Sequence, residues 1–128
     1  HCGWKGTLAE LAAKTAREMI KLGADPARIE AWIGPGICMK NYEVGADLAS
    51  QFRAKFPGAE ASLDGVRLDL AAAIRWQLEA AGLAPQNIFH AGECTIDRGD
   101  RYFSYRGEGP ETGRMITYIG FSPEETMP

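Results

Sequence analysis

The stretch HCGWKGTLAE, residues 1–10, places a glycine-rich segment with a histidine, a cysteine and a lysine directly before a helix-forming pattern. Thr7 and Glu10 have the spacing of a capping box, in which each side chain accepts a hydrogen bond from the other residue's amide. Apolar residues recur at helical spacing as far as Ile20, and Gly23 ends the run. Residues 1–6 are therefore predicted to form a loop at the start of a helix, where free first-turn amides favour an anion or a polar ligand.

The rest of the chain alternates between helical and extended patterns. These patterns predict strands at 29–33, 66–68, 88–89, 101–105 and 115–121, helices at 42–56 and 69–81, and a turn at Pro57-Gly58. Asp69 is expected to cap the last helix and Gly82 to end it. Residues 122–128 are expected to form a flexible tail. The order of these elements predicts a mixed α/β layer structure with helices outside.

Composition excludes several classes of protein. The chain has 128 residues, of which 45% are apolar and 24% charged, and its formal charge is −3. This suits one soluble domain with a core. Lys and Arg are scattered among acids, which argues against a nucleic-acid binder, and no apolar run approaches the roughly 20 residues that cross a bilayer. The three cysteines are an odd, widely spaced set, which favours a reducing cytoplasm over a disulfide framework.

His1 is either a metal ligand or an incidental histidine. Gly3 and Gly6 would let the backbone fold closely around a ligand, but a zinc site needs three or four ligands. No second histidine or Cys-x-x-Cys pair lies near His1 in the sequence. Glycine-rich loops that carry chemistry usually follow a strand that holds them in place. We therefore expect this chain to be part of a longer protein.

The cysteines and the second histidine each allow two interpretations. Cys2 could be a nucleophile, but neighbouring side chains in an extended loop point to opposite sides, which favours a small buried hydrophobe. Cys38 and Cys94 lie in loops, Cys94 past a strand end where binding residues often lie, and core packing is the alternative for both. His90 ends an apolar stretch and is interpreted as a surface histidine rather than a ligand.

Several cationic and aromatic residues are candidates for binding an anion or a planar ligand. Lys5 lies beside the predicted helix start. Arg106 and Arg114 flank a glycine-rich loop, where they could clamp a phosphate through bidentate hydrogen bonds or be solvated loop charges. Trp4 and Tyr42 could stack on a planar ligand or pack inside the protein. Spacing alone leaves these alternatives open.

Four segments together indicate a family. They are His1–Thr7, then Ile33–Ile37 with Asn41–Gly45, then Cys94-Thr95, and finally Phe103–Arg106 with Thr112–Met115. Their types, order and spacing resemble the C-terminal half of the family long labelled multicopper polyphenol oxidase, or laccase-domain, proteins, which is now understood as zinc-dependent purine nucleoside enzymes. The resemblance covers nearly the whole chain, so residues 1–128 are expected to be the C-terminal portion of a single domain of this kind.

The resemblance implies an α+β fold in which a mixed sheet core is sandwiched by helices, in α/β/β/α layers. It also implies phosphorolysis of adenosine, inosine, guanosine or methylthioadenosine, and deamination of adenosine. Family members hold zinc with two histidines and a cysteine, and His1 matches one of the histidines. The other ligands belong to segments upstream, so a missing N-terminal segment is expected to supply them. Lys5 replaces the family's usual arginine, which keeps the charge but loses the planar fork.

These expectations assign roles to four residues. His1 is the metal ligand, Lys5 and Arg106 are candidates for phosphate, and Tyr42 is a candidate for the base or sugar; no catalytic residue is identified. The metal is expected to activate water for deamination. Copper is not expected, because a laccase-type cluster needs many imidazoles and the chain has two histidines.

Two other functions remain open. The implied fold resembles that of toxin deamidases with a Cys/His pair, which suggests a cysteine hydrolase acting on amides, although this is analogy from fold. The chain could also be a non-catalytic half that needs its N-terminal complement. Such a half would leave a sheet edge or an apolar face exposed.

Overall fold

The computed structural model describes residues 1–57 and 63–121. Its helices are α1 (Trp4–Leu8), α2 (Leu11–Lys21), α3 (Ala46–Lys55), α4 (Leu70–Ala80) and α5 (Tyr105–Glu108), with 3₁₀ turns η1 (Met39–Asn41) and η3 (Pro85–Asn87). Its strands are β1 (Ala31–Ile33), β2 (Leu63–Asp64), β3 (Arg67–Leu68) and β4 (Ile88–His90). The described residues therefore form a mixed α/β structure, as the sequence predicts.

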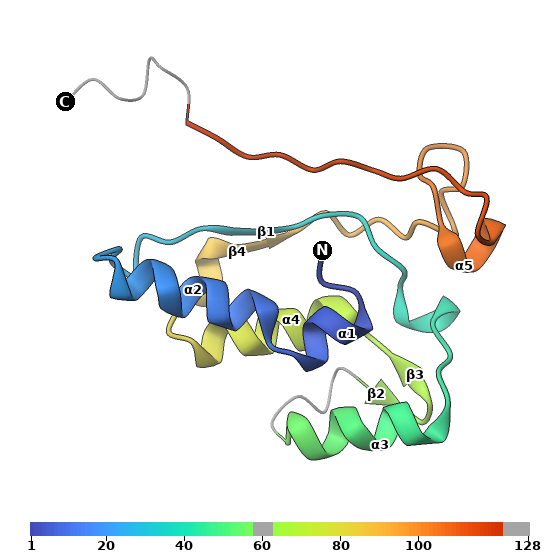
Figure 1. Ribbon diagram of the computed structural model, residues 1–128, viewed down its shortest axis with the longest axis horizontal. Helices are drawn as coiled ribbons and strands as arrows, with labels where there is room; N and C mark the ends of the chain where they lie inside the picture. The colour runs from blue at the N-terminus through green and yellow to red at the C-terminus, as the bar shows by residue number, and fades with distance from the viewer. Residues whose placement is uncertain (58–62, 122–128) are drawn as a thin grey trace.

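Strands β1 and β4 form a small parallel sheet against which the two longest helices pack. Ala31 pairs with Ile88 and Ile33 with His90. Figure 1 shows α2 and α4 on one side of this pair. The core between them consists of apolar side chains from α2, α4, β4 and the connections, against which Ala31 and Ile33 of β1 pack: Ala16, Ile29, Ile74, Leu78, Leu83 and Ile88. Burying these side chains is the main source of stability for this half of the structure.

A second core lies around α3 and contains aromatic side chains. Phe52 and Phe56 pack edge to face with ring centroids 5.6 Å apart, and Trp76 of α4 lies 5.8 Å from Phe56. Tyr42 and Leu68 complete the cluster. Because β3 hydrogen-bonds to the backbone beside η1, through the Leu68 amide and the Tyr42 carbonyl at 3.0 Å, this core fixes η1 relative to α4.

The first helix does not form as the sequence predicts. Residues 4–6, predicted as part of a loop, belong to α1, and Glu10 adopts a left-handed backbone conformation with φ of 56° that separates α1 from α2. The capping box is absent: the Thr7 hydroxyl donates to the Cys2 carbonyl at 3.1 Å, and the Glu10 carboxylate pairs with Lys55 of α3 at 2.9 Å. The hydrogen bond from Lys55 lowers the pKa of Glu10 despite the opposing effect of desolvation. A contact with a helix distant in sequence thus replaces the local cap.

Helix α3 also begins later than predicted, at Ala46 rather than residue 42. Gly45 occupies the N-cap in an extended conformation, and the preceding residues form η1 and a bridge to β3 instead. The strands predicted at 29–33, 66–68 and 88–89 are present as β1, β3 and β4, with ends shifted by one or two residues. The turn predicted at Pro57-Gly58 lies partly outside the described residues, and the flexible tail predicted at 122–128 lies wholly outside them.

The start of α4 confirms the predicted cap. The Asp69 carboxylate accepts a hydrogen bond from the Ala72 amide at 2.9 Å, and Gly82 follows the helix with φ of 104°. Asp69→Ala is expected to lower the free energy of unfolding by about 1 kcal/mol, because it leaves a first-turn amide without its acceptor. Asp69→Asn should retain most of that stability. Urea unfolding monitored by circular dichroism measures both, with the exposed Asp64→Ala as the control; equal stability of Asp69→Ala and the wild type would contradict the capping role.

The prediction of strands at 101–105 and 115–121 is wrong, because the described structure has no strand at either segment. Tyr105 begins the short helix α5, whose N-cap Ser104 accepts from the Gly107 amide. Residues 115–121 have no strand partner among the described residues. They run past β1 on the side opposite the helices (Figure 1). Their apolar side chains are exposed, with Ile116 at 90%, Tyr118 at 92% and Phe121 at 90%. The alternating pattern is that of a strand, but no described strand pairs with it.

The predicted helical layers are only partly present. Among residues 1–57 and 63–121, α2 and α4 cover one side of β1 and β4 (Figure 1). The other side carries no helix packed against it, so the described residues do not form a four-layer α/β/β/α sandwich. Within the same residues, no helix is long and apolar enough to cross a membrane.

Candidate functional site

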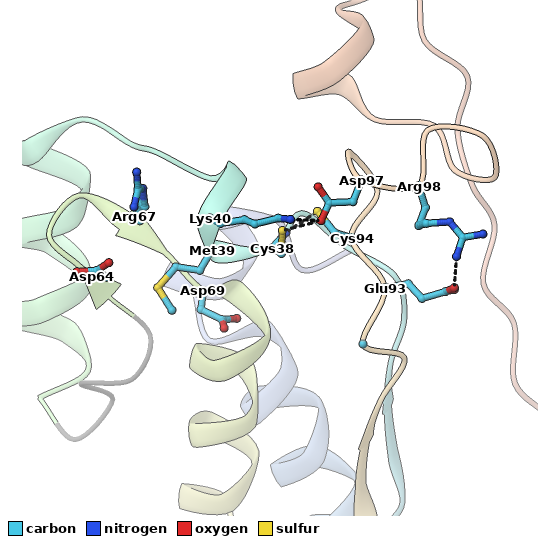
Figure 2. Close-up of a pocket in the computed structure, with 11 residues that line it drawn as sticks. Cys38, Met39, Lys40, Asp64, Arg67, Asp69, Glu93, Cys94, Asp97 and Arg98 are labelled. Carbon is cyan, nitrogen blue, oxygen red and sulfur yellow. Dashed lines mark hydrogen bonds and ion pairs between the residues drawn. The ribbon is translucent and has the colours of Figure 1, made fainter.

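A cavity of about 690 Å³ lies where η1, the β2–β3 hairpin, the start of α4 and the loop after β4 meet. Its lining mixes thiols, acids and cations, as Figure 2 shows: Cys38, Met39, Lys40, Asp64, Arg67, Asp69, Gly92, Glu93, Cys94, Asp97 and Arg98. This composition is suited to a polar or charged ligand rather than to an apolar one.

The parallel pairing of β1 and β4 explains why this cavity forms. Both strands end at the same edge of the sheet, and the segments that follow them stay hydrogen-bonded. The Thr95 amide donates to the Gly36 carbonyl at 3.0 Å, and Gly36 forms a parallel bridge with Cys94. Loops that follow the carboxyl ends of parallel strands meet at one place, which is where open α/β sheets bind ligands. Cys38 and Cys94, 56 residues apart in the sequence, are thereby brought into contact.

A hydrogen-bonded cluster forms one wall of the cavity. The Cys38 amide donates to the Cys94 sulfur at 3.2 Å. The Asn41 side-chain nitrogen lies 3.3 Å from each of the two sulfurs and 2.8 Å from a carboxylate oxygen of Asp97. The second oxygen of that carboxylate pairs with the Lys40 ammonium at 2.8 Å. Figure 2 shows the side chains of Cys38 and Lys40, at the start of η1, converging with those of Cys94 and Asp97 from the loop after β4.

The two thiols of this cluster are inequivalent. Burial raises the pKa of Cys94, but hydrogen bonds from Cys38, from the Asp97 backbone and from Asn41 outweigh it and lower the pKa to about 7. Burial and the interaction with Cys94 raise the pKa of Cys38. Hydrogen bonds from Lys40 and Asn41 lower the pKa of Asp97. The reduced, metal-free cluster therefore places its thiolate mainly on Cys94.

Asn41→Ala is expected to raise the pKa of Cys94 by roughly 1 unit, because a hydrogen bond to a charged group contributes about 1.5 kcal/mol or more and 1.36 kcal/mol corresponds to one unit. The thiolate fraction then increases at higher pH. The pH dependence of Cys94 alkylation by iodoacetamide, mapped by peptide mass spectrometry on reduced, chelator-treated protein, measures the shift. Asn87→Ala removes a comparable side-chain hydrogen bond to the Ala27 carbonyl and is the control. Superimposable profiles for Asn41→Ala and wild type would contradict this assignment.

His1 and Lys5 lie outside this cavity. His1 is exposed, and its ring folds over Gly3, where a Cβ atom would lie 2.8 Å from the His1 Nε2 atom. A Cβ atom at Gly6 would lie 2.8 Å from the His1 carbonyl oxygen. The two glycines are therefore needed for the way the first residue folds back. The Lys5 ammonium is exposed and lies 5.4 Å from the ring centroid of Trp4.

The structure does bring Tyr42 and Arg106 together. The Arg106 guanidinium carbon lies 4.9 Å from the Tyr42 ring centroid, and its Nη1 donates to the Glu43 carbonyl at 2.9 Å. Tyr42 is 7% exposed, so most of its ring belongs to the second core. Burial raises the pKa of Tyr42, opposed by the charge of Arg106. Arg106 itself is exposed and keeps further donors for a ligand.

The other candidate residues take ordinary structural positions. Cys2 packs against the first core, as expected for a small hydrophobe. His90 is exposed and lines a separate, smaller cleft of about 190 Å³. Arg114 donates to its own neighbours, the carbonyls of Thr112 and Gly113. The three cysteines are free thiols in this structure.

The sequence patterns do not predict that Cys38 and Cys94 converge, nor that Lys40, Asn41 and Asp97 lie beside them. In the part of the chain that the structure describes, Cys38, Cys94 and Asp97 form the one group of three side chains placed to hold a metal ion. His1 belongs to no such group there. The signal that could have found the cluster was positional, since both cysteines follow strands that pair in parallel.

Comparison with known proteins identifies the family. A model of the multi-copper polyphenol oxidoreductase laccase family matches residues 1–122. This chain belongs to that family. The resemblance predicted from the four sequence segments is therefore confirmed, and the laccase-family match extends through both cores and the cavity.

Relatives of this laccase-family chain carry names from nucleoside metabolism. It is 42% identical to a purine nucleoside phosphorylase of Deinococcus radiodurans, over 98% of the chain and 49% of that protein. It is 33% identical to adenosine deaminase RL5 of an unknown prokaryotic organism, over 93% of the chain and 48% of that protein. The chain thus spans about half the length of the curated relatives it matches.

Solved structures agree with the fold. The crystal structure of the Bacillus licheniformis hypothetical protein YfiH superposes with a TM-score of 0.74 at 30% identity, covering 85% of this chain and 44% of that one. YlmD from Geobacillus stearothermophilus gives a TM-score of 0.73 at 30% identity, covering 84% and 42%. The arrangement described above is therefore a family fold, seen over about half of the longer chains.

Proposed function

We propose that this chain is part of a zinc-dependent purine nucleoside enzyme, which cleaves adenosine, inosine, guanosine or methylthioadenosine with phosphate and deaminates adenosine. The observation that carries the proposal is the 42% identity, over 98% of the chain, to the purine nucleoside phosphorylase of Deinococcus radiodurans. The 33% identity to adenosine deaminase RL5 supports the deaminase activity. The proposed compartment is the cytoplasm, where the three free thiols would stay reduced.

The proposed domain is larger than this chain. We take residues 1–128 as the C-terminal portion of one laccase-family domain, whose remaining segment completes the α/β/β/α layers. The exposed apolar side chains at 116–121 support this, because soluble proteins rarely leave so many contiguous apolar groups in water. A segment lying beside them would bury those side chains and offer a sheet edge to the strand-like pattern of 115–121.

His1 is proposed as one zinc ligand. Its exposed imidazole, folded over Gly3, fits this role, but the described residues add no second or third donor beside it. The missing N-terminal segment is proposed to supply the others. Zinc held by His1 and those donors would supply Lewis-acid activation of water for deamination. A multi-copper site is not proposed, since it would require many imidazoles.

Arg106 and Lys5 are proposed to bind phosphate. Arg106 is held at one edge by its bond to the Glu43 carbonyl and by the face of Tyr42, so its orientation is fixed before an anion arrives. A preorganised guanidinium loses less entropy on binding than a free one and can form two parallel hydrogen bonds to phosphate oxygens. Lys5 lacks the fork and contributes charge alone.

Tyr42 is proposed to position the base or the sugar. The Arg106 guanidinium carbon lies 4.9 Å from the centroid of its ring, so a ligand that contacts Tyr42 would also be near the proposed phosphate group. In phosphorolysis, Arg106 would hold the phosphate whose oxygen attacks C1′, and Tyr42 would hold the base or the sugar, on two side chains that contact each other. Such positioning is a major contribution to catalysis, because it replaces a bimolecular encounter.

Product analysis on the protein that contains the complete domain tests this proposal. With phosphate present, inosine and guanosine should yield free base; without phosphate, adenosine should still yield inosine. Zinc removal by a chelator should abolish both reactions, and zinc addition should restore them. If zinc-loaded protein releases no base and forms no inosine, the proposed function is wrong. If instead a Cys2→Ala variant loses activity with zinc retained, the cysteine hydrolase chemistry is favoured.

A further inference from the structure

We propose that Cys38, Cys94 and Asp97 form a second binding site for a thiolate-preferring divalent cation of the zinc class, at the wall of the large cavity. The metal-binding atoms of these three residues all lie within 4.8 Å of one another. The site is complete within this chain and separate from His1, which does not line the cavity. It therefore does not depend on the function proposed above.

The backbone holds the donors in place before any ion binds. The bridge between Gly36 and Cys94 fixes the two loops relative to each other, and the Cys38 amide contacts the Cys94 sulfur at 3.2 Å. Cys94 is 7% exposed, so its side chain has little freedom. Preorganised donors reduce the entropy that an ion must offset on binding.

The Asn41 side-chain nitrogen marks the centre of the proposed site. It lies 3.3 Å from both sulfurs and 2.8 Å from the Asp97 carboxylate oxygen. An amide nitrogen has two hydrogens, so it cannot fully satisfy three acceptors. In a tetrahedral zinc site, with metal–donor lengths of about 2.0–2.3 Å, donor atoms lie roughly 3.3–3.8 Å apart. A modest contraction of the cluster, with rotation of Asn41 away, gives that geometry.

Charge favours a dication at this position. Two thiolates and one carboxylate carry three negative charges, and the Lys40 ammonium, 2.8 Å from Asp97, neutralises one of them. A divalent cation would neutralise the remaining two. Sulfur donors select zinc-class ions over magnesium or calcium, which prefer oxygen.

The cavity provides the fourth coordination position. Three protein donors leave one position for water or a ligand atom, and Cys38, Cys94 and Asp97 all line the cavity (Figure 2). Three protein ligands and an open position are typical of catalytic zinc sites, whereas structural sites are closed by four. The site is therefore suited to a small polar ligand that enters the cavity and coordinates the ion.

Cobalt substitution tests the site directly. The protein of residues 1–128, which does not carry the cysteine ligand expected in the upstream segment, should bind one Co²⁺ ion at this site when reduced and metal-free, and should develop a near-ultraviolet charge-transfer band that arises from thiolate coordination. Cys38→Ser and Cys94→Ser should each abolish the band, and Asp97→Asn should weaken Co²⁺ binding by about 10-fold or more. Cys2→Ser removes the thiol outside the cluster, and His1→Ala removes the proposed first-site ligand; both should keep the band.

Far-ultraviolet circular dichroism of each variant separates loss of the site from loss of folding. Cys94 is buried, so Cys38→Ser and the exposed Asp97→Asn keep the test valid if Cys94→Ser does not fold. Absence of a thiolate band in the reduced wild-type protein overturns the proposal. This holds even if Cys38 and Cys94 can form a disulfide when oxidised, because the titration uses reduced protein. A band that persists in folded Cys38→Ser, or that disappears in Cys2→Ser, also overturns it.

Discussion

His1→Ala, made in the protein that carries the complete family domain, is expected to remove the zinc of the proposed nucleoside site and to lower kcat/KM by at least about 100-fold. The imidazole is proposed as a direct ligand, and even indirect partners of metal ligands typically affect metal affinity or activity by about 10- to 100-fold. Metal analysis after gel filtration and initial rates of base release from inosine measure the two effects together.

His90→Ala is the matched control, since His90 is the second histidine of the chain and lines a separate cleft. It should keep both zinc and turnover. Zinc at the Cys38 cluster would persist in His1→Ala, so the metal count should fall by one ion rather than to zero if both sites exist. Full activity in His1→Ala with unchanged metal content would contradict the role of His1.

Arg106→Ala is expected to raise the KM for phosphate by about 10-fold or more, because hydrogen bonds to charged groups contribute about 1.5–3 kcal/mol. The phosphate KM of Arg106→Lys should lie between those of the wild type and Arg106→Ala, since lysine keeps the charge and loses the planar fork. Initial rates at varied phosphate and saturating inosine give the KM of each variant.

Arg114→Ala controls for the loss of an exposed loop arginine, because Arg114 bonds only to neighbouring backbone carbonyls in the described structure. Thermal unfolding is needed beside the kinetics, since Arg106 also contacts Tyr42 and the Glu43 carbonyl. A phosphate KM unchanged in a folded Arg106→Ala variant would remove Arg106 from the phosphate site. An equal rise of the phosphate KM in Arg114→Ala would show that the effect is not specific to Arg106.

Local signals in the sequence predicted the fold well where local contacts determine it. The cap at Asp69 and the glycine at residue 82 set both ends of α4, and the structure confirms both. The break at Glu10 could not be predicted in this way, because the carboxylate bonds to Lys55 on another helix. The periodicity of residues 8–20 carries no information about that distant cation.

The candidate site likewise contains features that local sequence predicts and features that depend on contacts distant in sequence. The His1–Thr7 motif was recognisable because its residues are consecutive, and the family it indicated is confirmed. The Cys38–Cys94 cluster depends on a parallel strand pairing across 56 residues, which spacing alone does not specify. Residues 115–121 show the opposite case: their alternation indicates a strand, but a strand also requires a pairing partner, and no described strand pairs with them.

The central claim is that the family domain containing this chain splits purine nucleosides with phosphate. Its most direct test is the stoichiometry of products from inosine, measured on zinc-loaded protein carrying the complete domain. We predict hypoxanthine and ribose 1-phosphate in equal amounts, with neither formed when phosphate is omitted. Hypoxanthine accompanied by free ribose, or no hypoxanthine at all, would contradict it.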